Sequence, residues 1–534
     1  MMWRQTSLLV GSLQKLRMSA SATTNQIPVA STLTLDASSS KRSISDRRLP
    51  LTLDQMNENY RRAQYAVRGA LVMQADSYLP KLQAQARGEP VVDPLPFSHV
   101  TYCNIGNPMQ LGQKPIHFFR EVLSLLEHPG LMDMPAATSC FSSDSIERAK
   151  VYLRANSSGT GAYTHSMGVP LVRQEVGDFI ARRDGFPADP SKIFLTDGAS
   201  SGVKLVLAML LRSSRDGVMI PIPQYPLYSA TLAMFDGAPI PYFLNEEKGW
   251  GLALDELERS YSEATSKGVV PRALVIINPG NPTGQVLSHD NMRDIVLFCD
   301  KYGILLMADE VYQENVYVKD TKPFVSFKRV AMELEKQLKR LQMVSFHSTS
   351  KGVIGECGKR GGYFELFGFD QGMIDEFYKC SSISLCPNTV GQFTTGLMVN
   401  PPKPGSPSFA RYTAERDGIY ESLKLRANQV TTALNKLEGV TCNPAEGAMY
   451  AFPRIRLSDQ AIKKAQDRKL APDAYYCARL LEKTGILVVP GSGFGQVEET
   501  WHFRTTFLPP PDQIVEFCNK LTAFHAEFIK EHAP

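Results

Sequence analysis

Short apolar runs of strand length alternate with segments of helical periodicity between about residues 100 and 400. Strands that are buried on both faces of a parallel sheet are continuous runs of Val, Ile and Leu, and helices connect them. One connecting helix is clear, because apolar residues recur at the helical spacing from Val203 to Leu211. The pattern predicts an α/β fold with a large, mainly parallel sheet. The expected strands are 193–195, 217–220, 273–277, 304–307 and 343–346.

The alternating pattern ends at residues 401–407, where four of the seven residues are proline. Proline continues neither a helix interior nor a central strand, so we place a domain junction there. A long helical pattern, short strands at 448–452, 486–489 and 501–507 and a last amphipathic helix follow, which predict a smaller α+β domain. The expected parts are a leader at 1–45, a segment at 46–105 that packs on the small domain or on a second subunit, a large α/β domain at 106–400 and the small domain at 401–534. Within the segment at 46–105 we expect a helical stretch from about 53 to 87.

Charge and cysteine content exclude several classes of function. The formal net charge is +4, but seven Lys and Arg against two Asp lie within the first 50 residues. The remainder is close to neutral and lacks the positive surplus that binds nucleic acid. No apolar run approaches the roughly 18 residues of a membrane span. The nine cysteines form no C-x-x-C pair, so we expect reduced thiols and no metal site.

The first 35 residues contain no Asp or Glu, and Arg4, Lys15 and Arg17 are interspersed with leucines. This composition is typical of an organelle import signal, while the apolar run that a secretory signal needs is interrupted by Gly11, Ser12, Gln14 and Lys15. We therefore expect a mitochondrial protein; a cytoplasmic protein with a disordered tail is the alternative. The last residues, Glu531–Pro534, do not form a peroxisomal signal.

The most informative stretch is S-F-H-S-T-S-K-G at 345–352, followed by G-K-R-G-G at 358–362. Lys351 directly follows a strand and lies among small hydroxyl residues and glycines, so a planar ligand can approach its amine without obstruction. Arg360, nine positions later, can supply a forked contact to a phosphate. The stretch predicts a site for a planar, phosphorylated ligand.

Two further strands deliver polar groups at their carboxyl ends, where open α/β sheets bind ligands. One runs into N-P-G-N-P-T-G at 278–284, and the other runs into Asp309-Glu-Val-Tyr312. Asp309 would be costly to bury unpaired after so apolar a run, so we expect a positively charged partner. The segment T-D-G-A-S-S-G at 196–202 opens the clear helix, and a helix N-terminus of this kind can bind an anion.

These motifs, in this order, resemble the fold-type I pyridoxal phosphate (PLP) aminotransferases, and the resemblance covers roughly residues 95–530. Within that family, H-S-T-S-K-G at 347–352 and G-E-C-G-K-R-G-G-Y at 355–363 resemble the alanine aminotransferase subgroup. The resemblance implies a large PLP-binding domain with a smaller α+β domain. It also implies amino acid and 2-oxo acid substrates, and a homodimer with shared active sites.

The resemblance assigns catalytic roles to three residues. Lys351 would hold PLP as a Schiff base and then move the proton at the substrate α-carbon. Asp309 would pair with the protonated pyridine nitrogen and keep the ring an electron sink. Tyr312 and Asn281 would donate to the phenolic oxygen of the ring, and the Asn281–Pro282 bond is expected to be cis.

The same resemblance assigns the phosphate contacts. Backbone amides of Ala199 and Ser200 would bind the phosphate together with Ser348 and Arg360. Tyr163 would reach the phosphate of the neighbouring subunit's cofactor, which requires a dimer.

The remaining expected contacts concern the ring face and the substrate. Tyr225 would stack on the cofactor, with Tyr228 as the competing residue. Arg504 would bind the substrate α-carboxylate in bidentate fashion, with Asn281 beside it, and Gly106 would close over that carboxylate.

The expected reaction interconverts L-alanine and 2-oxoglutarate with pyruvate and L-glutamate. A glutamate:glyoxylate aminotransferase is the nearest alternative, because its motifs are nearly identical. A PLP-dependent lyase of the aminocyclopropane-carboxylate synthase type is more remote. A regulator that retains the fold as a binding domain is disfavoured, since Lys351, Asp309 and Arg504 are all present.

Overall fold

The computed structural model describes residues 51–65, 67 and 69–533. The chain divides into two compact units, Met1–Met56 and Asn57–Pro534. In the first unit, the described residues 51–56 form a turn in which the amides of Gln55 and Met56 donate to the Thr52 carbonyl. The expected leader at 1–45 lies outside the described residues. All elements discussed below belong to the second unit.

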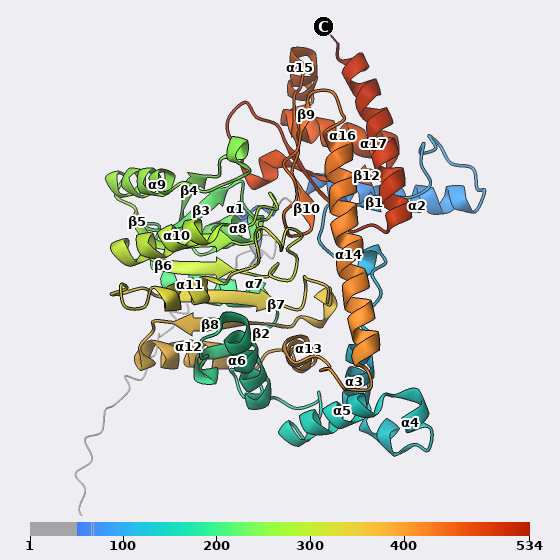
Figure 1. Ribbon diagram of the computed structural model, residues 1–534. Helices are drawn as coiled ribbons and strands as arrows, with labels where there is room; N and C mark the ends of the chain where they lie inside the picture. The colour runs from blue at the N-terminus through green and yellow to red at the C-terminus, as the bar shows by residue number, and fades with distance from the viewer. Residues whose placement is uncertain (1–50, 66, 68, 534) are drawn as a thin grey trace, which may run out of the picture. The chain divides into compact units, whose positions relative to one another are not determined.

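A seven-stranded sheet with the order β2-β8-β7-β6-β5-β3-β4 forms the centre of the larger part of this unit (Figure 1). The neighbouring strands from β7 to β4 are parallel, whereas β8 runs antiparallel to both β7 and β2. The predicted α/β class with a mainly parallel sheet is confirmed. The strands are β2 (Ile193–Thr196), β3 (Asp216–Ile222), β4 (Ala238–Phe243), β5 (Val270–Ile277), β6 (Leu305–Asp309), β7 (Met343–Ser348) and β8 (Gly362–Phe367).

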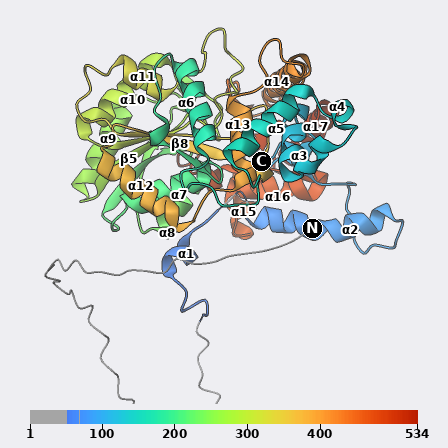
Figure 2. The ribbon, with the colours of Figure 1, turned by 90° about the horizontal axis from the view of Figure 1, so that it is seen from below.

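Helices cover both faces of this sheet (Figure 2). Alternate strand residues point to opposite faces, so Val218 and Ile220 join one apolar cluster while Met219 joins another. The first cluster contains α7 (Ala199–Leu210), α8 (Pro226–Met234) and α12 (Gln371–Ile383). The second contains α9 (Leu254–Ser266), α10 (His289–Tyr302) and α11 (Phe327–Glu333).

A third cluster packs against the β2 side of the sheet. It is formed by α3 (His117–Glu127), α5 (Ser143–Ala155), α6 (Pro170–Asp184) and α13 (Thr389–Val399), and the short α4 (Ala137–Cys140) lies between α3 and α5 in the chain. Within the described residues, no helix combines the length and the apolar character needed to cross a membrane.

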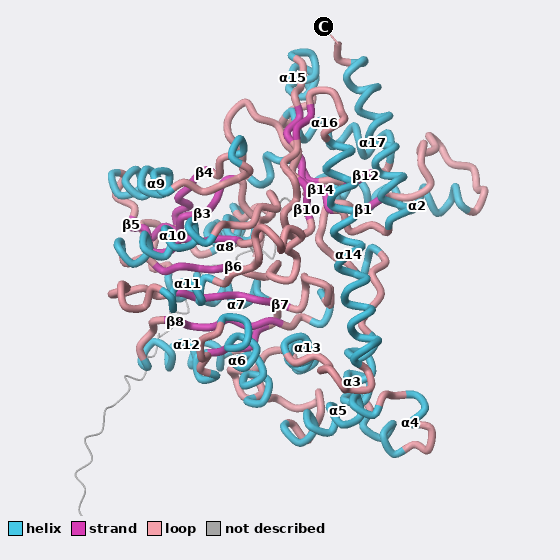
Figure 3. Tube along the Cα trace, viewed as in Figure 1, coloured by secondary structure: helices cyan, strands magenta, loops and turns pink. Residues whose placement is uncertain are grey.

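The carboxyl-terminal part combines helices with short strands (Figure 3). The strands predicted at 448–452, 486–489 and 501–507 form, but each is shorter than expected. They are β10 (Tyr450–Ala451), β12 (Ile486–Leu487), β13 (Val489–Pro490) and β14 (Phe503–Thr506), and β9 (Val440–Thr441) pairs with β11 (Arg454–Ile455). The helices are α14 (Phe409–Leu434), α15 (Asp459–Asp467), α16 (Pro472–Thr484) and α17 (Pro511–Glu531).

The amino-terminal segment of the unit packs on this carboxyl-terminal part. Its β1 (Thr101–Tyr102) runs parallel to β12, and α2 (Ala70–Ala86) contributes Ala75 to a cluster with Leu481 and Leu487. The helical stretch expected at 53–87 is not continuous, because α1 (Glu58–Arg62) ends before residues 63–65 and α2 begins after Gly69. The predicted domain boundaries remain predictions.

Candidate active site

A cavity of about 700 Å³ lies where β6 and β7 end. Eleven of the twelve site residues predicted from sequence line it, and they come from strand ends and loops around the sheet, from the start of α7, from the segment after β1 and from the carboxyl-terminal part. They are Gly106, Ala199, Ser200, Tyr225, Asn281, Asp309, Tyr312, Ser348, Lys351, Arg360 and Arg504. The location matches the rule that open α/β sheets bind ligands at the carboxyl ends of their strands.

Lys351 lies in the turn that follows β7, and its amine points to the wall formed by Gly106. Lys351 Nζ donates to the Gly106 carbonyl at 2.7 Å and lies 6.0 Å from the centroid of the Tyr312 ring. A Cβ at position 106 would lie 2.9 Å from this amine, so only glycine leaves it room. Within the described residues, no carboxylate forms an ion pair with Lys351, and the amine is available to a ligand.

Asp309 is the last residue of β6 and is only 5% exposed. Tyr228 Oη donates to Asp309 Oδ2 at 2.8 Å. Burial raises the pKa of Asp309 to about 6, although the hydrogen bonds from Tyr228 and Val311 and the charge of Lys351 partly oppose it. A buried carboxylate of this kind favours a cationic group in the ligand.

The two tyrosines considered for the ring face lie in different surroundings. Tyr228 is fully buried in the core beneath the cavity, whereas Tyr225 lines the cavity. Tyr225 therefore remains the residue predicted to stack on a planar ligand. Its hydroxyl lies 2.8 Å from the hydroxyl of Tyr65, a cavity residue that the sequence motifs do not mark.

Asn281 connects the two polar sides of the cavity. Its Nδ2 donates to Tyr312 Oη at 3.4 Å, and its Oδ1 accepts from Arg504 Nη1 at 3.0 Å. The Asn281–Pro282 bond is cis, as expected.

Arg504, on β14, is only 1% exposed. Its Nη2 donates to the Asn104 carbonyl, and its buried Nε has no hydrogen-bond partner in the described structure. The guanidinium carbon lies 4.2 Å from the centroid of the Tyr450 ring and 4.7 Å from that of Phe494. A buried guanidinium with an unpaired donor and no carboxylate partner among the described residues fits an anionic substrate group.

An anion subsite lies at the start of α7. The first turn of this helix has free N–H groups, no side chain caps it, and Gly198 before it has a φ of 76°. Arg360 Nη2 donates to the Asp197 carbonyl at 2.8 Å and lies 3.4 Å from Ser200 Oγ. A helix N-terminus and a guanidinium directed to the same point fit a phosphate.

Tyr163 is the one predicted site residue that does not line the cavity. It lies between α5 and α6 and is 76% exposed. Its expected role concerns a neighbouring subunit and stays a prediction.

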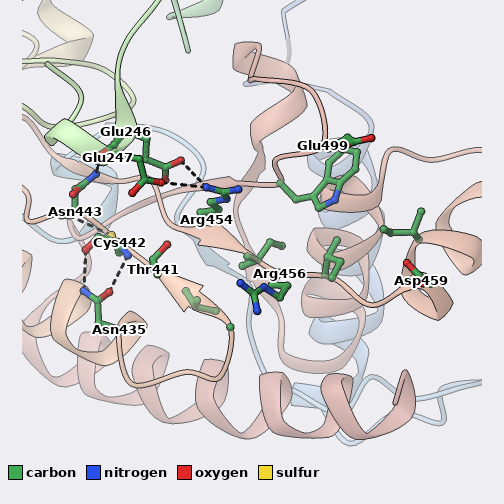
Figure 4. A pocket seen from close by; sticks show the side chains of 16 residues that line it. Glu246, Glu247, Asn435, Thr441, Cys442, Asn443, Arg454, Arg456, Asp459 and Glu499 are labelled. Carbon is green, nitrogen blue, oxygen red and sulfur yellow. Dashed lines mark hydrogen bonds and ion pairs between the residues drawn. The ribbon is translucent and has the colours of Figure 1, made fainter. Parts of the chain in front are cut away.

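A larger hollow of about 1010 Å³ lies elsewhere, over the strands β9 and β11. Figure 4 shows that Arg454 pairs with two of its acidic groups: it lies 3.8 Å from Glu246 and 3.5 Å from Glu247. Asn443 Nδ2 donates to the Glu246 carbonyl at 2.9 Å. None of the predicted site residues lines this hollow, so we place the candidate active site in the smaller cavity.

A lysine, a buried carboxylate and a buried arginine around an anion subsite, on this fold, define the class of protein. Residues 137–521 match the profile of the family "Aminotransferase class I and II". The chain therefore belongs to the class I and II aminotransferases, and the predicted family is confirmed.

The chain is also similar to individual aminotransferases of known name. The chain is 56% identical over 482 residues to the "Probable alanine aminotransferase, mitochondrial" of Dictyostelium discoideum, which covers 90% of each chain. It is 47% identical to "Glutamate–glyoxylate aminotransferase 1" of Arabidopsis thaliana, over 90% of this chain and 97% of the relative. An alanine aminotransferase structure from Pyrococcus furiosus has the same fold, with a TM-score of 0.67, 22% identity, and coverage of 88% of this chain and 100% of that one.

Proposed function

We propose that this protein is a PLP-dependent aminotransferase that interconverts L-alanine and 2-oxoglutarate with pyruvate and L-glutamate. The observation that carries the proposal is the convergence of Lys351, Asp309 and Arg504 on one cavity. The higher identity to a relative named as an alanine enzyme, 56% against 47% for a glutamate–glyoxylate enzyme, supports alanine as the amino donor.

The cavity fits PLP at each of its functional groups. Lys351 Nζ would hold it covalently, Asp309 would pair with its ring nitrogen, and Tyr312 and Asn281 would donate to its phenolic oxygen. The first turn of α7, with Ser348 and Arg360, would bind the phosphate, and Tyr225 would cover the ring. When bound, PLP supplies a sink for the electrons left on the α-carbon when its proton departs.

The residues of the chain then share the remaining tasks. Arg504 and Asn281 bind the substrate α-carboxylate and so fix the direction in which the α-hydrogen points. Lys351 Nζ takes the proton from the α-carbon and later returns one. Tyr228 donates to Asp309 and helps to keep this buried carboxylate charged.

A panel of donors and acceptors with the purified, PLP-loaded enzyme tests the proposal. We expect alanine-dependent pyruvate formation with a kcat/KM for 2-oxoglutarate at least about tenfold above that for glyoxylate. Activity with glyoxylate alone would point to the glutamate:glyoxylate reaction. Release of methylthioadenosine from S-adenosylmethionine would point to a lyase.

Replacing Arg504 with lysine should lower kcat/KM for alanine about 100-fold, because one ammonium cannot reproduce a forked, charge-assisted contact to a carboxylate. Steady-state kinetics with alanine and with its amide, which has no α-carboxylate, measure the effect. For the amide, kcat/KM of the Arg504→Lys variant should stay close to that of wild type. An equal loss with both donors would show that Arg504 does not bind the carboxylate.

We also propose that the active unit is a homodimer to which Tyr163 contributes across the interface. Light scattering should give about twice the 59.2 kDa of one chain. Tyr163→Phe should weaken PLP binding about tenfold, since it removes a hydrogen bond to a charged group, without dissociating the dimer. A monomeric enzyme with full activity would contradict the proposal.

We further propose a mitochondrial location, on the composition of the first 35 residues and the printed name of the Dictyostelium relative. A fluorescent fusion that retains the amino terminus should enter mitochondria, and deletion of residues 1–45 should leave it in the cytoplasm.

A further inference from the structure

Tyr450, the first residue of β10, is a cavity residue to which no motif assigns a role. It is only 2% exposed, and it pairs with Thr506 in the antiparallel register between β10 and β14. This register brings its side chain beside Arg504, two residues before Thr506. Tyr450 lines the cavity together with Arg504 and Lys351.

The Tyr450 ring holds one face of the Arg504 guanidinium. The guanidinium carbon lies 4.2 Å from the Tyr450 centroid, and Phe494 covers it at 4.7 Å. Two aromatic rings at these distances orient a planar cation by cation–π attraction, which is strongest in a desolvated site. Because Arg504 Nε has no partner in the described structure, the rings and the contacts to Asn281 and Asn104 fix how the guanidinium meets a carboxylate.

The Tyr450 hydroxyl lies at a different place, between Tyr312 and Lys351. Tyr312 Oη donates to Tyr450 Oη at 3.3 Å. A Cβ on Gly106 would collide with the Tyr450 hydroxyl and would lie 2.9 Å from Lys351 Nζ, so both groups border the same small space.

The positive charges of Lys351 and Arg504 make the Tyr450 hydroxyl more acidic. Burial raises the pKa of Tyr450, but the charges of Lys351 and Arg504 and the Tyr312 hydrogen bond outweigh burial and the opposing effect of Cys357, and hold the pKa below its ordinary value. A phenol in this field is a better hydrogen-bond donor than an ordinary tyrosine. Because hydroxyls rotate, Tyr450 can donate to Tyr312 whenever Tyr312 donates elsewhere.

We propose that Tyr450 is a positioning residue with two separable parts: its ring orients Arg504 for the substrate carboxylate, and its hydroxyl strengthens Tyr312 as a donor to the cofactor. The inference rests on the proposed function, in which Tyr312 donates to the phenolic oxygen of PLP. Hydrogen bonds in a chain polarise one another, so a donor to Tyr312 strengthens the bond that Tyr312 makes in turn.

Two substitutions separate the parts. Tyr450→Phe retains the ring and removes the hydroxyl, whereas Tyr450→Leu removes both. Two quantities are measured on the PLP-loaded proteins: the pH midpoint of the visible absorption band, and the dissociation constant of 2-aminoisobutyrate, an amino acid without an α-proton. The first reports on the environment of the phenolic oxygen, and the second reports on carboxylate binding without turnover.

For Tyr450→Phe we expect the midpoint to rise by about half a pH unit, because a weaker donor stabilises the deprotonated phenolic oxygen less. The dissociation constant should stay within about twofold of wild type. For Tyr450→Leu we expect the same shift in midpoint and a dissociation constant raised at least about tenfold.

Tyr475→Phe is the matched control, because Tyr475 is also buried and its hydroxyl contacts His532 at 3.1 Å, outside the cavity. It should change neither quantity, and thermal melting checks that all three variants fold. An unchanged midpoint in Tyr450→Phe, or wild-type affinity in Tyr450→Leu, would overturn the inference. If wild-type protein itself shows no titrating band and forms no pyruvate from alanine, the proposed function fails instead.

Discussion

Replacing Lys351 with alanine should abolish alanine-dependent pyruvate formation, with a loss in kcat of at least about 10⁴-fold. The amine is both the proposed attachment point of PLP and the group that moves the α-proton, so its removal eliminates two functions at once. The Gly106 carbonyl, which accepts the hydrogen bond of this amine, cannot carry a proton in its place. A coupled assay for pyruvate measures the loss.

Lys359→Ala is the matched control for this substitution. Lys359 lies in the same glycine-rich stretch, near Arg360, but does not line the cavity, so its replacement should leave kcat within about twofold. Borohydride reduction followed by peptide mass spectrometry should find the pyridoxyl label on the peptide that contains Lys351. A label on another lysine, or substantial activity in Lys351→Ala, would show that the assignment is wrong.

The sequence predicted eleven of the residues that line the cavity, and several of them were found because they lie at strand ends. Asp309 ends β6, Asn281 follows β5 and Lys351 follows β7, and parallel strands bring their carboxyl ends to one edge of a sheet. Local motifs therefore specify a three-dimensional cluster. Arg504, the proposed carboxylate-binding residue, lies far along the chain, and the family resemblance, not the strand order, assigned its role.

The residues that sequence reasoning missed depend on pairings that no local pattern specifies. Tyr450 enters the cavity through the register of the two-residue strand β10 against β14, and such short strands carry little periodicity. Tyr65 enters through a segment outside regular structure that packs on α8 by tertiary contacts. The sequence analysis named Tyr228 only as a competitor of Tyr225 for stacking on the cofactor. It could not show that the Tyr228 hydroxyl donates to Asp309.

The short strands of the carboxyl-terminal part and the break between α1 and α2 have a similar cause. Apolar residues at 448–452 predict a strand, but only Tyr450 and Ala451 find a ladder partner. Likewise, helical propensity continues through 53–87, while tertiary contacts and Gly69 determine where the helices start and stop.

Asp309→Asn should separate stability from catalysis. In the cofactor-free protein burial disfavours the charge and raises the pKa of Asp309 from its ordinary value of 3.8 to about 6. A folded state that holds its proton more tightly than the unfolded state loses stability as pH rises from about 4 to about 6. Ionised Asp309 thus costs the cofactor-free fold about 3 kcal/mol above pH 6. Asparagine cannot ionise, so the variant does not have this cost.

Urea unfolding of cofactor-free wild type and variant at pH 4 and pH 7 measures this difference. Other titrating groups cancel between the two proteins, so the free energy of unfolding of the variant relative to wild type should rise by about 2 kcal/mol from pH 4 to pH 7. A difference that does not depend on pH would mean that Asp309 is not the buried acid that the structure describes.

In the PLP-loaded enzyme, the substitution Asp309→Asn should be harmful, because it should lower kcat. A neutral amide cannot hold a positive charge on the ring nitrogen, so the electrons left on the α-carbon are less stabilised and kcat should fall about 10³-fold. Tyr228→Phe, which leaves the carboxylate in place but removes its hydrogen bond, should lower kcat far less, by about tenfold. Deuterium at the α-carbon should slow Asp309→Asn at least as much as wild type, since proton removal becomes the slow step. A variant that turns over at the wild-type rate would mean that the stability cost of a buried, ionised Asp309 serves no catalytic purpose.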